Sequence, residues 1–109
     1  MTTYLISFPA AAMVIDEGDF EAVVESSHAV IREAKAAGVC VFGGGIDEAV
    51  RPVLVHADGR VSAETSYLDG GFCVLDLPTR AEAERWAARI AAACRTPQEL
   101  RAFGDDPES

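Results

Sequence analysis

The sequence predicts an α+β fold on an antiparallel sheet, and three observations support that class. Segments with period-two apolar alternation are interleaved with two segments of helical periodicity. Their order along the chain is strand, helix, strand, hairpin, strand, helix and a short final strand. That order is a split βαβ pattern, in which two helices cover one face of the sheet. Half of the 109 residues are apolar, which is enough for one core and one domain.

The first half of the chain is predicted to form a strand, a helix and a second strand. Residues 4–8, YLISF, alternate as a strand does. Gly38 ends the helix that follows, whose apolar stripe at helical spacing consists of Phe20, Val23, Val24, Ser27, Ile31 and Ala34. Residues 39–42, VCVF, form the second strand, and the glycines at 43–45 end it in a turn or bulge.

A hairpin and a further strand are predicted next. Asp58 and Gly59 form a pair that accepts the positive φ angles of a tight hairpin turn, and they join residues 51–57 to residues 60–65. Residues 62–77, SAETSYLDGGFCVLDL, then run from a polar loop through two glycines into another strand.

The second helix is predicted to begin at a capping box. Thr79 and Glu82 have the spacing at which the two side chains bond free backbone amides of the first turn. The apolar face of this helix then consists of Ala83, Trp86, Ala87, Ile90 and Cys94. Residues 96–99 are predicted to form a short helical turn before the last strand at 100–103.

Two of the predicted strands, 39–42 and 72–75, have apolar residues on both faces. Two helices cover only one face of a sheet, so the other face would expose an apolar patch that needs a partner. The economical partner is a second copy, packed sheet on sheet about a twofold axis. We expect one of two sets to form this interface, of about 1,600 Å² or more: Val39, Val41, Phe72 and Val74, or Cys40, Phe42, Cys73 and Leu75.

The charge of the chain argues against nucleic acid and anionic membranes as partners. The net charge is −9 and the pI is near 4.5, so a phosphate backbone would be repelled over most of the surface. The first fifteen residues lack a positive segment and contain Pro9, so no signal peptide is predicted. No apolar stretch is long enough for a membrane span. These features indicate a cytoplasmic protein.

Cysteine and histidine placement predicts neither a disulfide nor a metal site. Cys40, Cys73 and Cys94 are odd in number and lie in apolar settings, as reduced and buried thiols do. His28 and His56 have no metal-ligand spacing to each other or to a cysteine. We therefore expect no bound metal and no cofactor.

Several stretches of the chain are similar to one known family. They are AAGVCVFGGGI at 36–46, AET at 63–65, LDGGFCVLDL at 68–77 and AEAERWAARI at 81–90. Together they resemble the YCII-related family in its DGPF branch, although the hairpin here reads DGRV where the branch has its DGPF tetrad. The resemblance implies ferredoxin-like subunits that assemble as a dimeric α+β barrel. The domain would span residues 1–104 and leave 105–109 as an acidic C-terminal tail.

His28 is the one candidate for a catalytic role. It lies at the edge of the first helix's apolar stripe, where an imidazole could enter a cleft between helix and sheet as a general base. The resemblance places His28 near a proposed catalytic histidine of the wider family, with Ala36 and Ala37 in the region of its partner aspartate. The alternative is an ordinary boundary histidine bonded to Glu25 or to water.

Such a cleft would take polar groups from the first strand and from the 62–69 loop, and Ser7, Glu64 and Tyr67 are the candidates. Alternatively, this loop is only a solvated connection. The hypothesis is a homodimer that binds a small molecule in a helix and sheet cleft, with weak enzymatic activity through His28. Two other classes remain open. One is a non-catalytic regulatory or interaction module, and the other is a cofactor-independent enzyme of the dimeric α+β barrel type, which needs a paired acid and base.

Overall fold

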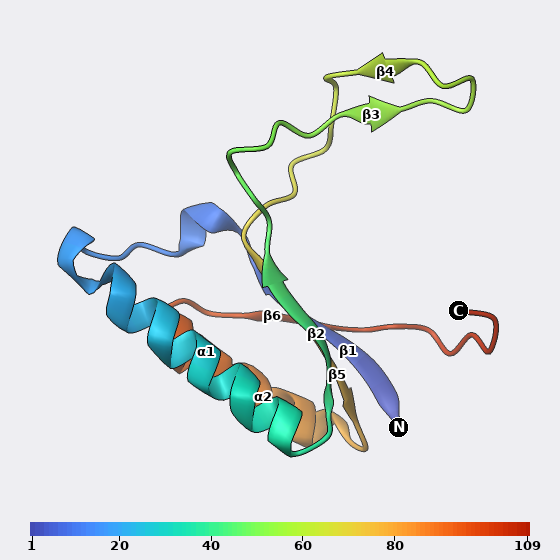
Figure 1. The fold of residues 1–109 in the computed structure, drawn as a ribbon. Helices are drawn as coiled ribbons and strands as arrows, with labels where there is room; N and C mark the ends of the chain where they lie inside the picture. Colours follow the sequence, from blue (N-terminus) through green and yellow to red (C-terminus); the bar gives the residue numbers. More distant parts are fainter.

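A computed structural model describes residues 1–109 and confirms an α+β fold with a four-stranded antiparallel sheet. The strand order is β2-β5-β1-β6, and two helices pack on one face of the sheet (Figure 1). The elements of this layer are β1 (Thr2–Phe8), α1 (Phe20–Ala36), β2 (Cys40–Gly45), β5 (Gly71–Leu77), α2 (Arg80–Cys94) and β6 (Glu99–Ala102). Two short 3-10 helices, η1 (Ala10–Ala12) and η2 (Glu17–Asp19), connect β1 to α1.

The core lies between the helices and the central strands β1 and β5. These strands pair antiparallel along their whole length, from Thr2 opposite Leu77 to Phe8 opposite Gly71. Residues directly opposite each other share a face, so alternate residues of both strands point toward the helices. The buried core residues are Tyr4, Ile6, Cys73, Leu75 and Leu77 from the sheet, and Ala34, Ala83, Ala87, Ile90 and Cys94 from the helices.

Local signals position both helices where the sequence predicts them. The Thr79 side chain accepts a hydrogen bond from the Glu82 amide at 3.2 Å, which confirms the N-cap of α2. Gly38, with a φ of 75°, follows the last turn of α1 as a left-handed stop. Neither helix is long and apolar enough to cross a membrane.

The end of the chain differs from the predicted helical turn at 96–99. The Thr96 hydroxyl is buried and donates to the Ala12 carbonyl oxygen at 3.1 Å, so it ties the connection to the η1 segment instead of capping a turn. The chain is then extended from Glu99, where β6 begins beside β1. The predicted last strand therefore exists but starts one residue earlier, and the turn was wrong.

Strand β2 contains the glycines that were expected to end it. Gly43, Gly44 and Gly45 pair with Cys73, Phe72 and Gly71 of β5, so they belong to the ladder. The pairing skips Val41, which lies at a β-bulge between Cys40 and Phe42. The partner strand therefore extends the sheet over residues that sequence alone assigns to a turn.

The bulge also changes which residues share the face away from the helices, here called the open face. Leu5, Val74 and Phe42 lie opposite one another on it, and Phe72 lies beside them. Neither interface set predicted from the sequence is correct as a whole. Phe72 and Val74 do lie on the open face, but the bulge brings Phe42 there in place of Val41, and Val39 packs against the core. In the other set, Cys73 and Leu75 are buried beneath the helices.

The predicted hairpin exists, but it is a separate sheet and not part of the main one. Strands β3 (Leu54–Val55) and β4 (Val61–Ser62) pair only with each other. The turn between them closes with a hydrogen bond from the His56 amide to the Arg60 carbonyl oxygen at 2.8 Å, and Gly59 has the positive φ expected there. Residues 50–62, here called the arm, project away from the body of the molecule (Figure 1).

The chain returns from the arm to β5 through Gly70 and Gly71, where backbone meets backbone. Gly70 has a φ of +89°, and a Cβ there would overlap the carbonyl oxygen of Phe8. A Cβ on Gly71 would lie 2.6 Å from the ring of Phe8. Gly70 is therefore required by contact with the backbone at the end of β1, beyond the conformational freedom that a turn demands, whereas a Cβ at Gly71 would have to displace the Phe8 ring.

This contact predicts different costs for two alanine substitutions at glycines with the same φ. Gly59 also has a φ of +89°, but nothing lies within 4 Å of its Cβ position. We expect Gly59→Ala to lower the free energy of unfolding by about 1 kcal/mol, and Gly70→Ala by about 3 kcal/mol or more because overlap adds to strain. Urea unfolding of both variants measures the difference. Equal losses would contradict the close approach at Phe8.

Candidate functional site

A cleft of about 960 Å³ opens on the helix side of the sheet, between α1 and the end of β2. Its walls come from α1, from the glycines of β2, from the loop at 46–49 and from the ends of β1 and β5. Apolar side chains dominate the lining, among them Ile6, Phe8, Met13, Val23 and Ile31. The volume is within the range of small-molecule sites, roughly 300–1,000 Å³.

Glycine in β2 allows a side chain of α1 to pack closely against the strand beside the cleft. Gly43 lies opposite Cys73, on the side of the sheet that faces the helices, and contributes no side chain. A Cβ at Gly43 would lie 3.2 Å from Cδ1 of Ile31 on α1. Backbone therefore forms part of the floor, and a larger residue at this position would have to displace the Ile31 side chain.

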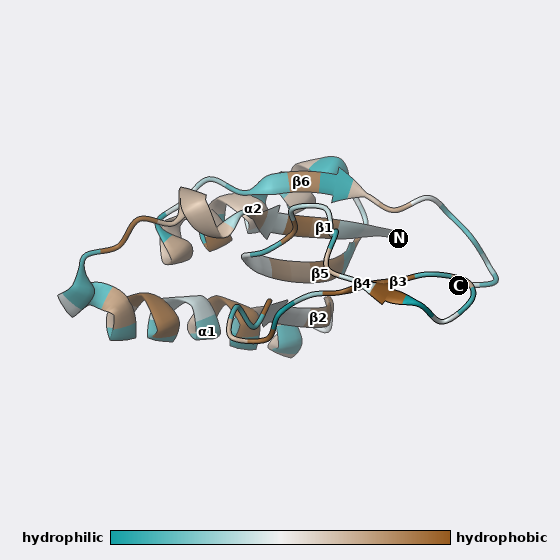
Figure 2. Cartoon of the chain, turned by 90° about the horizontal axis from the view of Figure 1, so that it is seen from above, coloured by the Kyte–Doolittle hydropathy of each residue, from teal (hydrophilic) through white to brown (hydrophobic).

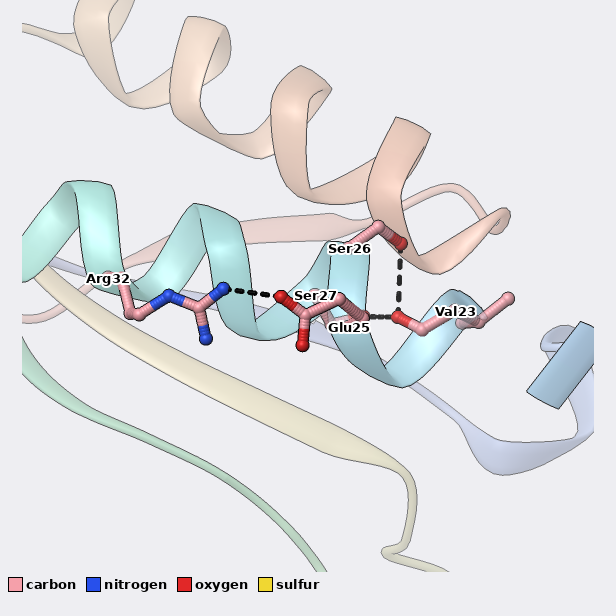
Figure 3. A network of polar contacts seen from close by, with 5 residues as sticks. All are labelled: Val23, Glu25, Ser26, Ser27 and Arg32. Atoms are coloured by element: carbon pink, nitrogen blue, oxygen red, sulfur yellow. Dashed lines mark hydrogen bonds and ion pairs between the residues drawn. The ribbon is translucent and has the colours of Figure 1, made fainter. Parts of the chain in front are cut away.

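His28 lies at the rim of the cleft, on α1, with its side chain exposed to solvent. The structure gives its ring no hydrogen-bond partner. Glu25, which the sequence offers as a partner, instead accepts a 2.6 Å hydrogen bond from Arg32 (Figure 3). The ring is therefore free to contact a ligand at the rim, but no acid or base is arranged to assist it.

Two serines anchor α1 at the back of the cleft. The Ser27 hydroxyl donates to the Val23 carbonyl oxygen at 2.7 Å and lies 3.3 Å from the sulfur of Cys94 on α2. The Ser26 hydroxyl lies 2.7 Å from the Ala93 carbonyl oxygen, one of the carbonyls that α2 leaves free at its C-terminal end. These contacts join the first turns of α1 to the last turn of α2.

Cys73 and Cys94 also line the cleft, and all three cysteines are unpaired thiols. Burial raises the pKa of the Cys73 thiol to about 12, and the neighbouring Cys40 and Cys94 add to the increase. The thiolate is the nucleophilic form of cysteine, so Cys73 is inert at neutral pH. Covalent chemistry on this thiol is therefore disfavoured.

The other predicted site residues lie outside the cleft. Ser7 is buried on the opposite side of β1, between Phe72 and Glu99, because the strand alternation that brings its neighbours to the helix side turns Ser7 away. Glu64 and Tyr67 are exposed in the loop before β5. A hydrogen bond to the Asp69 carboxylate raises the pKa of Tyr67. The structure thus brings His28 to the cleft and does not bring these three residues to it.

Four polar residues of the cleft were not singled out in the sequence. Lys35 lies two helical turns after His28, and this spacing of seven could have identified it. Asp47 and Glu48 follow the glycine strand directly and lie on the other side of the opening, whereas Gln98 comes from the segment before β6. Asp47, Glu48 and Gln98 have no such spacing to His28, because only the fold brings them to the cleft beside α1.

The arrangement is suited to binding an amphipathic molecule. Its apolar walls offer dispersion contacts, and its rim carries Lys35 and the His28 imidazole on α1 and carboxylates on the 46–49 loop. No group of three or more histidine, cysteine or carboxylate side chains is placed to hold a metal ion. In comparisons with known proteins, the chain matches no family model and no curated protein.

The raised pKa of Cys73 predicts how stability depends on pH. The unfolded thiol titrates near 9.0 and the folded one near 12, so the folded state holds this proton more tightly. Its contribution to stability is complete below about pH 9 and is lost as the pH rises toward about 12. We expect the free energy of unfolding to fall across this window less in Cys73→Ala than in the wild type. Urea unfolding at several pH values measures this, and parallel curves would contradict a buried Cys73 thiol.

Proposed function

We propose that the protein is a homodimer that binds a small amphipathic molecule in the cleft between α1 and β2. The cleft itself is the observation that carries this proposal, because it combines a volume of about 960 Å³ with a lining of apolar side chains and glycine backbone. Apolar walls with few polar groups are the usual composition of small-molecule sites.

The rim favours a ligand with an apolar body and a polar or charged end. His28 and Lys35 are placed on one side to meet an anionic or hydrogen-bonding group, and Asp47 and Glu48 are placed on the other side. An apolar body would lie against the side chains beneath them. Binding of this kind needs no proton transfer, which fits a rim without a paired acid and base.

A binding role is better supported than catalysis. The cofactor-independent enzyme requires a general base with a partner, whereas the His28 ring has no hydrogen-bonded partner and the Cys73 thiol is held protonated. A regulatory module that senses a small molecule uses the same cleft, so it stays the second candidate. It would differ from a simple carrier in changing its contacts with another macromolecule when the ligand binds.

We also propose that the fold is ferredoxin-like and that two subunits form a dimeric α+β barrel. A strand order of β2-β5-β1-β6 with both helices on one face is the ferredoxin-like arrangement, once the inserted arm is set aside. In the dimeric α+β barrel that the YCII-related resemblance implies, the open faces of two such subunits pack together. The apolar residues of the open face support this assembly.

Surface area also supports a dimer. A compact monomer of this mass exposes about 5,800 Å², whereas this chain exposes 7503 Å², and only 14 of its 109 residues are buried. The excess is about 1,700 Å² per chain relative to that scaling. Two chains that buried it would form an interface of roughly 3,400 Å², which is typical of obligate homodimers.

If the cleft is the binding site, substitutions inside it should weaken ligand binding and a substitution far from it should not. A thermal-shift screen of small amphipathic acids and amines should yield compounds that raise the melting temperature of the wild type. We expect Gly43→Val to abolish these shifts by displacing Ile31, which lines the cleft, and His28→Ala to reduce the shifts of the acids. Gly104→Val, in open space far along the chain, is the control and should keep all shifts. Shifts that survive Gly43→Val in a folded variant would place binding elsewhere.

The open face predicts an effect of charge on assembly. Val74→Asp places a carboxylate at the centre of this face, and we expect it to raise the dimer dissociation constant at least roughly 100-fold, because each dimer loses two buried valines. Val14→Asp adds the same charge at a position that is 83% exposed and away from the sheet, so it should leave the constant unchanged. Sedimentation velocity across a concentration series measures both. An unchanged Val74→Asp dimer would show that the open face is not the interface.

A further inference from the structure

The arm lacks the contacts that normally stabilise a hairpin. Strands β3 and β4 contain two residues each, and they pair with no other strand. An isolated two-stranded hairpin is marginally stable at best in water, and three strands or a packed layer are usually needed. The arm therefore requires a surface that its own body does not supply.

One face of the arm is apolar and the other is partly polar. Val55 and Val61 lie directly opposite each other in the ladder, so their side chains share a face. They are 63% and 57% exposed. On the other face Leu54 lies opposite Ser62, whose hydroxyl is 3.2 Å from Nε2 of His56. The valine face is thus the part of the arm that gains from being covered.

The arm extends over the same side of the molecule as the open face. In Figure 1 the helices lie below and to the left of the sheet, while β3 and β4 extend above and to the right of it. Figure 2 shows the same relation from above, with the helices to the left of the strands and the arm, brown along β3, to their right. A body seated on the open face would therefore lie beside the arm.

The shape and charge of the chain fit a second copy as that body. The radius of gyration is 15.6 Å, whereas a compact chain of this length has about 13 Å. Residues 50–62 hold two of the nine basic residues but only one of the eighteen carboxylates, so the arm is slightly cationic and the rest of the chain strongly acidic. An arm that reaches across to another copy meets opposite charge there.

We propose that the arm of each chain packs its valine face on the second copy of the dimer, so that the two arms clasp the partner bodies across the twofold axis. This inference rests on the homodimer proposed above and adds a second contact region to it. Because a twofold interface repeats every contact, each dimer buries two valine faces. The β-branched valines are stiff at χ1 and lose little rotamer freedom when they are covered.

The test compares two arm variants in the full chain. Val55→Asp places a carboxylate on the valine face, and Ser62→Asp places the same charge on the opposite face of the same hairpin. We expect Val55→Asp to raise the dimer dissociation constant roughly 100-fold, since two valine burials are lost per dimer. Ser62→Asp should change it less than about tenfold. Sedimentation velocity gives the constants, and circular dichroism checks that the main fold persists in each variant.

The outcomes separate this inference from the homodimer proposal. A dimeric wild type with equal dissociation constants for both variants and the wild type overturns the clasp and leaves the open-face dimer standing. Equal weakening by both variants also overturns it, because the effect would then be one of charge and not of the valine face. A monomeric wild type over the whole concentration series overturns the dimer and the clasp together. Selective weakening by Val55→Asp supports the clasp.

Discussion

The pairing of β5 with β1 is the contact on which the rest of the structure depends. It places seven residue pairs in register and thereby decides which side chains face the helices. Side chains alternate at a period of two, so a slip of one residue would turn Leu75 outward and Val74 into the core. The close approach of Gly70 and Gly71 to Phe8 fixes the end of this register, since it leaves no room for a Cβ.

The same register separates two surfaces with different properties. On the helix side, α1 and the glycines of β2 line the cleft, and the serines of α1 hold that helix against the end of α2. On the opposite side, aromatic and aliphatic residues lie on a face that neither helix covers (Figure 1). A ligand in the cleft and a second copy on the open face would therefore lie on opposite sides of one sheet. The two strands β2 and β5 contribute to both.

Much of the fold can be predicted from local signals. The helices follow from their periodicity and from the Thr79 cap, and the hairpin turn follows from Asp58 and Gly59. These features depend on residues close together in the chain. The bulge at Val41 could not be predicted, because it is defined by the register with β5. The glycines of β2 were misassigned for the same reason, since their strand conformation comes from a partner that lies further along the chain.

The candidate site was predictable only in part. The edge of a helical stripe indicates a boundary position for His28, and the structure has this residue exposed at the rim. Ser7 was taken for a cleft residue, yet its side of β1 is set by alternation relative to Ile6, and the structure buries it away from the cleft. Asp47 and Glu48 reach the cleft through the path of the chain after β2, which spacing along the sequence does not reveal.

The claim that the open face belongs to a second copy is tested most directly by the mass of the particle in solution. Small-angle X-ray scattering of the wild-type protein gives the mass and the radius of gyration in one measurement. A clasped dimer predicts a mass twice the 11.5 kDa of the chain at micromolar concentration. A mass of one chain over the whole concentration range, with a radius of gyration near the 15.6 Å of the isolated chain, would contradict it.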